Sequence, residues 1–178
     1  MQKAFAWILL PLTACSSTMM AETVAVSEVS LAKLALADGT SKGVATISQR
    51  TDGLWLEVSA SKMAAGTYGI HLHAFGKCEG PDFTSAGPHW NPAQKQHGFD
   101  NPMGAHAGDL RNLVVGANGV GAIIAKLPTV LFSGEGGALD ADGLAIVIHE
   151  KPDDYSTDPS GNSGKRVVCG VFTKKEGI

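Results

Sequence analysis

Residues 31–60 have the sequence LAKLALADGTSKGVATISQRTDGLWLEVSA, and this stretch decides the fold class. Apolar and polar residues alternate along it, which is typical of strands with one buried face. The dipeptides Asp38-Gly39 and Asp52-Gly53 interrupt the alternation, and each is a strong signal for a hairpin turn. The stretch therefore predicts three antiparallel strands joined by two short turns.

The same pattern recurs along the rest of the chain. Further strands are predicted at GTYGIHLHAF (66–75), on both sides of Asn118-Gly119 within 112–128, at GLAIVIHE (143–150) and at KRVVCGVF (165–172). Residues 76–109 and 152–164 do not alternate, and loops of such length are often functional. We therefore expect an all-β domain, an eight-stranded antiparallel Greek-key sandwich or flattened barrel with two long functional loops.

The composition bounds the class of protein. At 178 residues the chain has room for one domain with a sizeable core, and its 22 glycines agree with many tight turns. The formal net charge is −3, which gives no support for nucleic-acid binding.

The first residues have the features of an export signal. MQK is followed by the short apolar run AFAWILLPL, which is too short to span a bilayer. Leu12 to Cys15 then read LTAC, which resembles a bacterial lipobox. We predict a lipoprotein-type signal peptide at 1–14, lipidation of Cys15, a tether at 15–24 and the folded domain at 25–178. The alternative is an ordinary signal cleaved near Ala14 or Ala21.

Export would place the domain in the periplasm or cell envelope, touching the membrane only through the lipid anchor on Cys15. In such an oxidising compartment the two remaining cysteines, Cys78 and Cys169, are expected to form a disulfide across about ninety residues. The alternative is a pair of buried free thiols.

Histidine placement points to metal binding. Of the six histidines, five lie between positions 71 and 106. His71 and His73 are two residues apart in a predicted strand, so their imidazoles share one face and form a two-point chelate. His149 ends another predicted strand and could supply a third nitrogen, because imidazole is the commonest ligand of zinc and copper.

A second group of ligands lies in the long loop. His97, His106 and Asp109 could bind a second ion, and zinc would order a loop with so little apolar content. His89 lies between the two groups in sequence. Its imidazole has two nitrogens, each of which can bind a metal.

Five segments together resemble the metal-site segments of copper/zinc superoxide dismutase. They are GIHLHAFGKC, AGPHWNP, KQHGFDNPMGAHAGDLRNL, IVIHEKPDD and GNSGKRVVCGV, and they occur in the family's order within residues 31–172. The cysteine context and the lipobox resemble the exported bacterial branch. The resemblance implies an enzyme that dismutes superoxide, with copper and zinc as cofactors. It is compatible with a monomer or a homodimer.

The resemblance also implies a role for each site residue. The copper ligands would be His71, His73, His89 and His149, and the zinc ligands would be His89, His97, His106 and Asp109. His89 would bridge the two ions and take part in proton transfer. Asp153 would link a copper-binding to a zinc-binding imidazole, and Arg166 would guide the anion. Without the resemblance, Asp153 would be interpreted as a solvated loop acid and Arg166 as a solvent-facing strand residue.

Two alternatives to the enzyme remain open. The first is a non-catalytic zinc- or copper-binding module of the same fold, and the second is a structural sandwich whose histidines bind nothing.

The second loop departs from the family's eukaryotic members, because it lacks their cluster of acidic and basic residues. Lys151 and Lys165 are the only lysines in and beside this loop, and the sequence does not indicate which of them guides the substrate.

Overall fold

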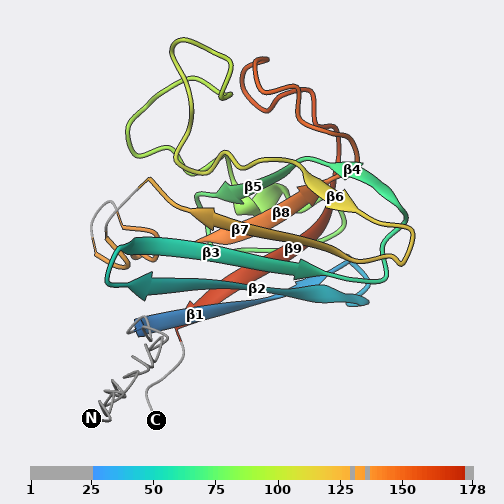
Figure 1. The fold of residues 1–178 in the computed structure, drawn as a ribbon, viewed down its shortest axis with the longest axis horizontal. Coiled ribbons are helices and arrows are strands. Elements are labelled where there is room, and N and C mark those ends of the chain that lie inside the picture. The colour runs from blue at the N-terminus through green and yellow to red at the C-terminus, as the bar shows by residue number, and fades with distance from the viewer. Residues whose placement is uncertain (1–25, 129–130, 135–136, 175–178) are drawn as a thin grey trace, which may run out of the picture.

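The computed structural model describes residues 26–128, 131–134 and 137–174 (Figure 1). Within these ranges the chain forms one short 3-10 turn, Thr84–Ala86, and nine strands. The strands are β1 (Val26–Ala35), β2 (Ser41–Arg50), β3 (Gly53–Ala60), β4 (Gly66–Tyr68), β5 (Ile70–His73), β6 (Leu113–Val115), β7 (Gly121–Lys126), β8 (Ala145–His149) and β9 (Arg166–Lys174). Every strand pairing is antiparallel, which confirms the predicted fold class.

The structure has one strand more than the eight that the sequence predicts. The predicted strand at 66–75 divides at Gly69, because Tyr68 pairs with Leu113 of β6 whereas Ile70 pairs with Ile148 of β8. A side chain at position 69 would place its Cβ 2.8 Å from the Cβ of Ser163, so the chain passes close to the second loop at this corner. Glycine is the residue that such close backbone approach requires.

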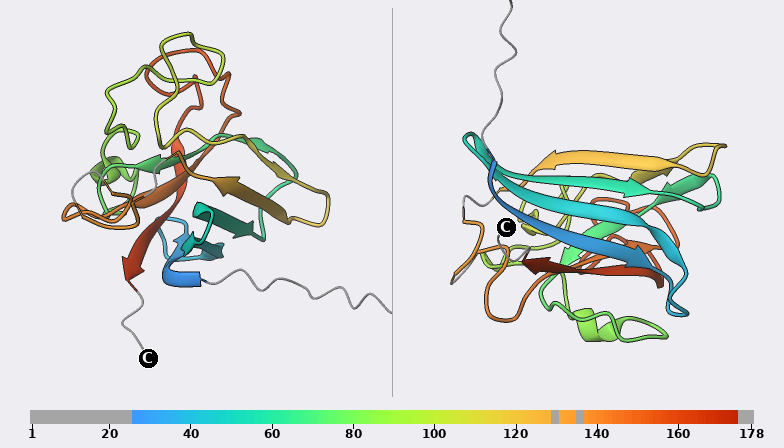
Figure 2. Two further views of the ribbon diagram at one scale, coloured as in Figure 1. Left: turned by 60° about the vertical axis from the view of Figure 1, so that its left-hand side comes forward. Right: turned by 90° about the horizontal axis from the view of Figure 1, so that it is seen from below.

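The nine strands form one strongly curved sheet in the order β4-β6-β7-β3-β2-β1-β9-β8-β5. Its two terminal strands, β4 and β5, are joined directly through Gly69, so the sheet closes on itself as a flattened barrel. Figure 2 shows β1, β2, β3 and β7 side by side as one layer, and Figure 1 shows β5, β8 and β9 behind this layer. This closure leaves few free edges.

The core fills the space between the two layers. In β3 the buried residues Leu54, Leu56 and Val58 alternate with more exposed ones, as the sequence pattern predicts. Strand β8 is buried at all five positions. Ile146 packs in the main core, and Val147 packs on the other face in a smaller cluster near the disulfide, so β8 provides a rigid support for the residue at its end.

Cys78 and Cys169 form the predicted disulfide, which ties the loop after β5 to β9. The later part of the first loop and the second loop lie together at one end of the barrel, at the top of Figure 1, whereas Phe83 and Ala86 of the first loop pack against β8. The two loops contact each other directly, because the backbone N–H of Asp100 donates to the carbonyl of Tyr155 at 2.9 Å.

The predictions for the N-terminal segment concern residues 1–14, the tether 15–24 and Cys15, all of which lie outside the described residues. Among the residues that the structure describes, no helix has the length and apolar character needed to cross a membrane.

Candidate metal centre

All six histidines and two aspartates meet beneath the two loops. Each of these side chains is buried, with no more than 9% of its surface exposed. Strand β5 positions His71 and His73, and the end of β8 positions His149. The first loop supplies His89, His97, His106 and Asp109, and the second supplies Asp153. The structure therefore brings together every residue of the predicted metal sites.

Four ring nitrogens form the first cluster. They are buried and have no hydrogen-bond partner among the described residues, and they are Nδ1 of His71 and Nε2 of His73, His89 and His149. Ligand atoms of these four residues lie within 4.8 Å of one another. Leaving a buried polar atom unpaired is costly, so four such atoms facing one point fit a shared ligand. A metal ion that accepts imidazole nitrogens satisfies all four at once.

The opposite nitrogens of three of these rings are held by hydrogen bonds. His71 Nε2 donates to Asp153 Oδ2 at 2.7 Å, His73 Nδ1 to the carbonyl of Gly87 at 2.8 Å, and His149 Nδ1 to the carbonyl of Gly164 at 3.2 Å. Each of these nitrogens carries the ring proton and donates a hydrogen bond to an oxygen. The other nitrogen of the same ring therefore presents a lone pair. The contacts thus fix both the tautomer and the orientation that a metal requires.

The second cluster surrounds one oxygen of Asp109. Its Oδ1 lies 2.9 Å from His89 Nδ1, 3.0 Å from His97 Nδ1 and 3.2 Å from His106 Nδ1. One carboxylate oxygen cannot accept three good hydrogen bonds, since it has two lone pairs. In a tetrahedral zinc site, neighbouring ligand atoms are about 3.3 Å apart. The three-nitrogen, one-oxygen set therefore fits zinc.

His71 also lies close to the second cluster, since one of its nitrogens is within 4.8 Å of the ligand atoms of His89, His97 and Asp109. However, His71 Nδ1 faces the first cluster and its Nε2 is hydrogen-bonded to a carboxylate. His106 Nδ1 lies 3.4 Å from His89 Nδ1, so His106 is the better fourth member.

His89 belongs to both clusters. Its Nε2 is one of the four unpartnered nitrogens, and its Nδ1 contacts Asp109. Its ring stacks on that of His71, with a centroid separation of 4.0 Å. One imidazole thus presents a nitrogen to each site.

Asp153 links the two clusters from the other side. Its Oδ2 accepts from His71 Nε2 and its Oδ1 accepts from His97 Nε2, the latter at 3.0 Å. Gly161 has a φ of +63°, and a Cβ there would come within 1.8 Å of Asp153 Oδ1. A glycine is therefore required beside this carboxylate, both for the backbone conformation and for the space.

Burial sets the charge of the first cluster. It lowers the pKa of His71 to about 3 and that of His149 to about 4, and it holds the pKa of His73 well below the usual value. All three rings are therefore neutral near pH 7. Burial also lowers the pKa of His97, but hydrogen bonds to Asp109 and Asp153 outweigh it and raise the pKa to about 9.

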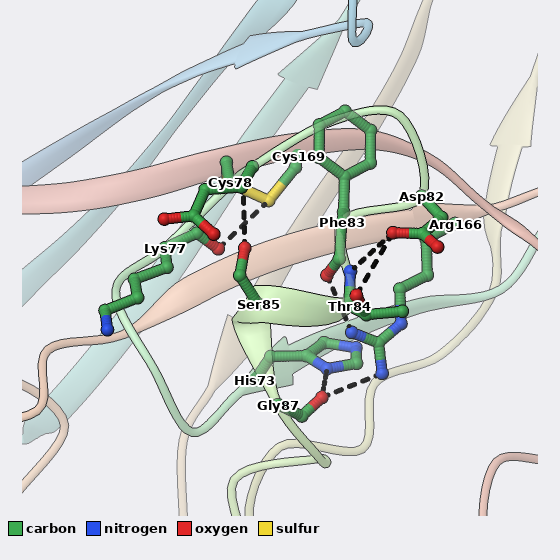
Figure 3. Close-up of a disulfide and its surroundings, with 11 residues drawn as sticks. His73, Lys77, Cys78, Asp82, Phe83, Thr84, Ser85, Gly87, Arg166 and Cys169 are labelled. Carbon is green, nitrogen blue, oxygen red and sulfur yellow. Dashed lines mark hydrogen bonds between the residues drawn. A yellow bond between two sulfur atoms is a disulfide. The ribbon is translucent and has the colours of Figure 1, made fainter.

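A cavity of about 710 Å³ opens over the first cluster, and its lining includes His89 and His149. Arg166, at the start of β9, also lines it. Its guanidinium donates to the carbonyls of Phe83 at 2.8 Å and of Gly87 at 2.7 Å (Figure 3). Since Gly87 also accepts from His73, the arginine is fixed beside the first cluster and its charge faces the opening.

Charged residues that the sequence analysis did not select also line this cavity. Lys95 comes from the first loop, and Asp140 and Asp142 come from the segment before β8. Lys151 and Lys165 are not among the lining residues. No local signal distinguishes Lys95 in the sequence, because its position at the opening depends on the path of the whole loop.

Comparison with known proteins agrees with this geometry. The family model for copper/zinc superoxide dismutase matches residues 41–172. The superoxide dismutase-like protein YojM of Bacillus subtilis is 48% identical over 139 residues, 76% of this chain and 71% of that protein. Superoxide dismutase [Cu-Zn] 1 of Aquifex aeolicus is 41% identical over 136 residues, 75% of this chain and 80% of that protein. The crystal structure of a SOD-like protein from Bacillus subtilis superimposes with a TM-score of 0.76 at 42% identity, covering 84% of this chain and 100% of that one.

Proposed function

Since the chain belongs to the copper/zinc superoxide dismutase family, we propose that it is an active superoxide dismutase. Copper and zinc are the cofactors of this family, and the chain has histidine clusters able to hold both ions. The reaction would convert two superoxide anions and two protons into one dioxygen and one hydrogen peroxide. The observation that carries the proposal is a set of four buried nitrogens that have no hydrogen-bond partner in the described part of the chain, beneath an opening that an arginine lines.

Copper would be held by His71, His73, His89 and His149 through those four nitrogens. When bound, it would supply the one-electron redox chemistry that the reaction needs. The protein contributes rigid placement of the rings, because β5 and β8 are paired and β8 is buried on both faces.

Zinc would be held by the Nδ1 atoms of His89, His97 and His106 together with Asp109 Oδ1. Zinc is redox-silent, so its contribution is to order the first loop and to fix the orientation of His89. Asp153 would help to orient one ring of each site, because it accepts hydrogen bonds from His71 and from His97.

Two residues would act on the substrate itself. The Arg166 guanidinium would attract the anion and hold it by charge-assisted hydrogen bonds. His89 would carry a proton on Nε2 whenever that nitrogen is free of metal, and it would donate this proton to the bound anion on the way to peroxide. A shared ring is suited to both tasks because Nδ1 stays anchored while Nε2 changes partner.

The competing function is a non-catalytic metal-binding module of the same fold. The name of YojM, superoxide dismutase-like, keeps this alternative in view because family membership alone does not establish activity. The complete set of donor residues and the placement of Arg166 favour the enzyme.

The test is superoxide consumption by the mature protein loaded with copper and zinc, measured beside metal content. Rapid, copper-dependent loss of superoxide is expected, and a His71→Ala variant should abolish it. Full occupancy by both metals without activity would favour the binding module. Failure to bind either metal would overturn both functions.

The disulfide is typical of proteins outside the cytoplasm, in an oxidising compartment. We propose further that the protein is exported and anchored to a membrane of the cell envelope through a lipid on Cys15. Mass spectrometry of the mature N-terminus tests this, since an unmodified start beyond Cys15 would contradict the anchor.

A further inference from the structure

Three residues outside the metal centre form a cluster of their own. Each of them follows a metal-centre residue by two positions: Phe99 follows His97, Arg111 follows Asp109, and Tyr155 follows Asp153. The guanidinium carbon of Arg111 lies 4.5 Å from the ring centroid of Phe99 and 5.0 Å from that of Tyr155. The two ring centroids are 5.9 Å apart. We call Phe99, Arg111 and Tyr155 the arginine clamp.

Hydrogen bonds connect the clamp to the backbone around it. The hydroxyl of Tyr155 accepts from the backbone N–H of Asn112 at 2.8 Å. The side chain of Asn112 donates to the carbonyl of Asp153 at 2.9 Å and accepts from the N–H of Asp153 at 2.8 Å. Segments 97–100, 109–112 and 153–155 are thus joined at one place on the surface of the two loops.

Each of the three segments carries one group of the metal centre. The first and second carry His97 and Asp109 of the proposed zinc set, and the third carries the carboxylate that bonds to His97. His97 and Asp153 lie in loop segments without strand pairing, and Asp109 makes only an isolated bridge to His71 of β5. Their spacing therefore depends on contacts between the loops, and the clamp supplies such a contact without touching the donor atoms.

We propose that Arg111 is a positioning residue that, by stacking on Phe99 and Tyr155, holds the zinc donors in register before the ion binds. The inference rests on the proposed zinc site. A guanidinium suits this role because it is planar and can stack on two rings while its edges remain in water. Preorganisation raises affinity by reducing the ordering that binding must otherwise bring about. Two exposed cation–π contacts correspond to roughly 5- to 30-fold in zinc affinity.

The experiment compares Arg111→Met with Arg50→Met in the full-length protein after its metals are removed. Both substitutions remove a guanidinium that lies over an aromatic ring, because Arg50 lies 5.1 Å from the ring centroid of Trp55, on strands β2 and β3. Zinc affinity is measured by competition with a chelator, and copper affinity is measured separately. A third variant, Arg111→Lys, keeps the charge but loses the planar group.

We expect Arg111→Met to weaken zinc binding by roughly 5- to 30-fold, Arg111→Lys to weaken it less, and Arg50→Met to leave it unchanged. Copper affinity should stay the same in all three. If Arg111→Met lowers the melting temperature but leaves zinc affinity at the wild-type value, the role of Arg111 is merely structural and the inference is overturned. A wild type that binds no zinc would instead overturn the zinc site itself, and the inference with it.

Discussion

Reduction of the disulfide should remove a large part of the stability of the metal-free protein. Cys78 and Cys169 are 91 positions apart, so the bond closes a long loop in the unfolded chain. The chain-entropy relation gives about 4.6 kcal/mol at 25 °C for a loop of this length. Domains are typically stable by only about 5–15 kcal/mol, so this contribution decides whether the reduced protein stays folded.

The loss should also reach the cavity over the first cluster. The disulfide anchors the loop that presents the carbonyls of Phe83 and Gly87, and these are the two acceptors that fix Arg166 (Figure 3). Gly87 also accepts from His73. A loosened loop therefore frees the arginine as well as one ring of the first cluster.

Urea unfolding of the metal-free wild type, with and without a thiol-free reductant, measures the effect without changing the sequence. With a denaturant dependence of about 2 kcal/mol per molar, the midpoint should fall by roughly 2 M on reduction. A Cys78→Ala, Cys169→Ala double variant is the control, because the reductant should not affect it. If reduction lowers the free energy of unfolding by less than about 1 kcal/mol, the reasoning is refuted, because the bond would then restrict the unfolded chain very little.

Three further predictions concern the site. Replacing His89 by Ala should uncouple the two metals, and a copper spectrum and rate equal to those of the wild type would count against a shared ring. Arg166→Glu should lower the rate of superoxide consumption and reverse its dependence on salt, whereas a nearly unchanged rate would assign guidance to other charges. The melting temperature of the metal-free protein should decrease as pH falls from about 6.5 towards 4, because burial lowers the pKa of His71 to about 3 and of His149 to about 4. The unfolded state binds more protons over this range, so a flat profile would contradict neutral buried rings.

The sequence predicted the strands well wherever one face is buried and a tight turn follows. The hairpins at Asp52-Gly53 and at Asn118-Gly119 are present. The predicted number of strands was one too low because of the break at Gly69. A strand that changes partners at a corner has the same sequence alternation as a continuous one.

The sequence also predicted which residues would gather at the metal centre, but not the contacts that orient each ring. The orientation of each ring depends on pairings between distant segments, such as the isolated bridge between His73 and His89. Lys95 and Arg111 could not be selected, because an exposed cation in a loop has no local pattern that indicates its neighbours. Their positions follow from the mutual packing of the two loops.

The place of β9 in the sheet has a consequence for how the protein folds. This strand lies between β1 and β8, and its partners on the β1 side are far away in sequence, as for Ser30 and Lys174. Without β9, the β5–β8 ribbon that carries His71, His73 and His149 would have no hydrogen-bonded connection through β1 to the rest of the sheet. Contacts at such separations form slowly because a long stretch of chain must be closed first. We therefore expect the first cluster to form late in folding, after β9 has paired with β1.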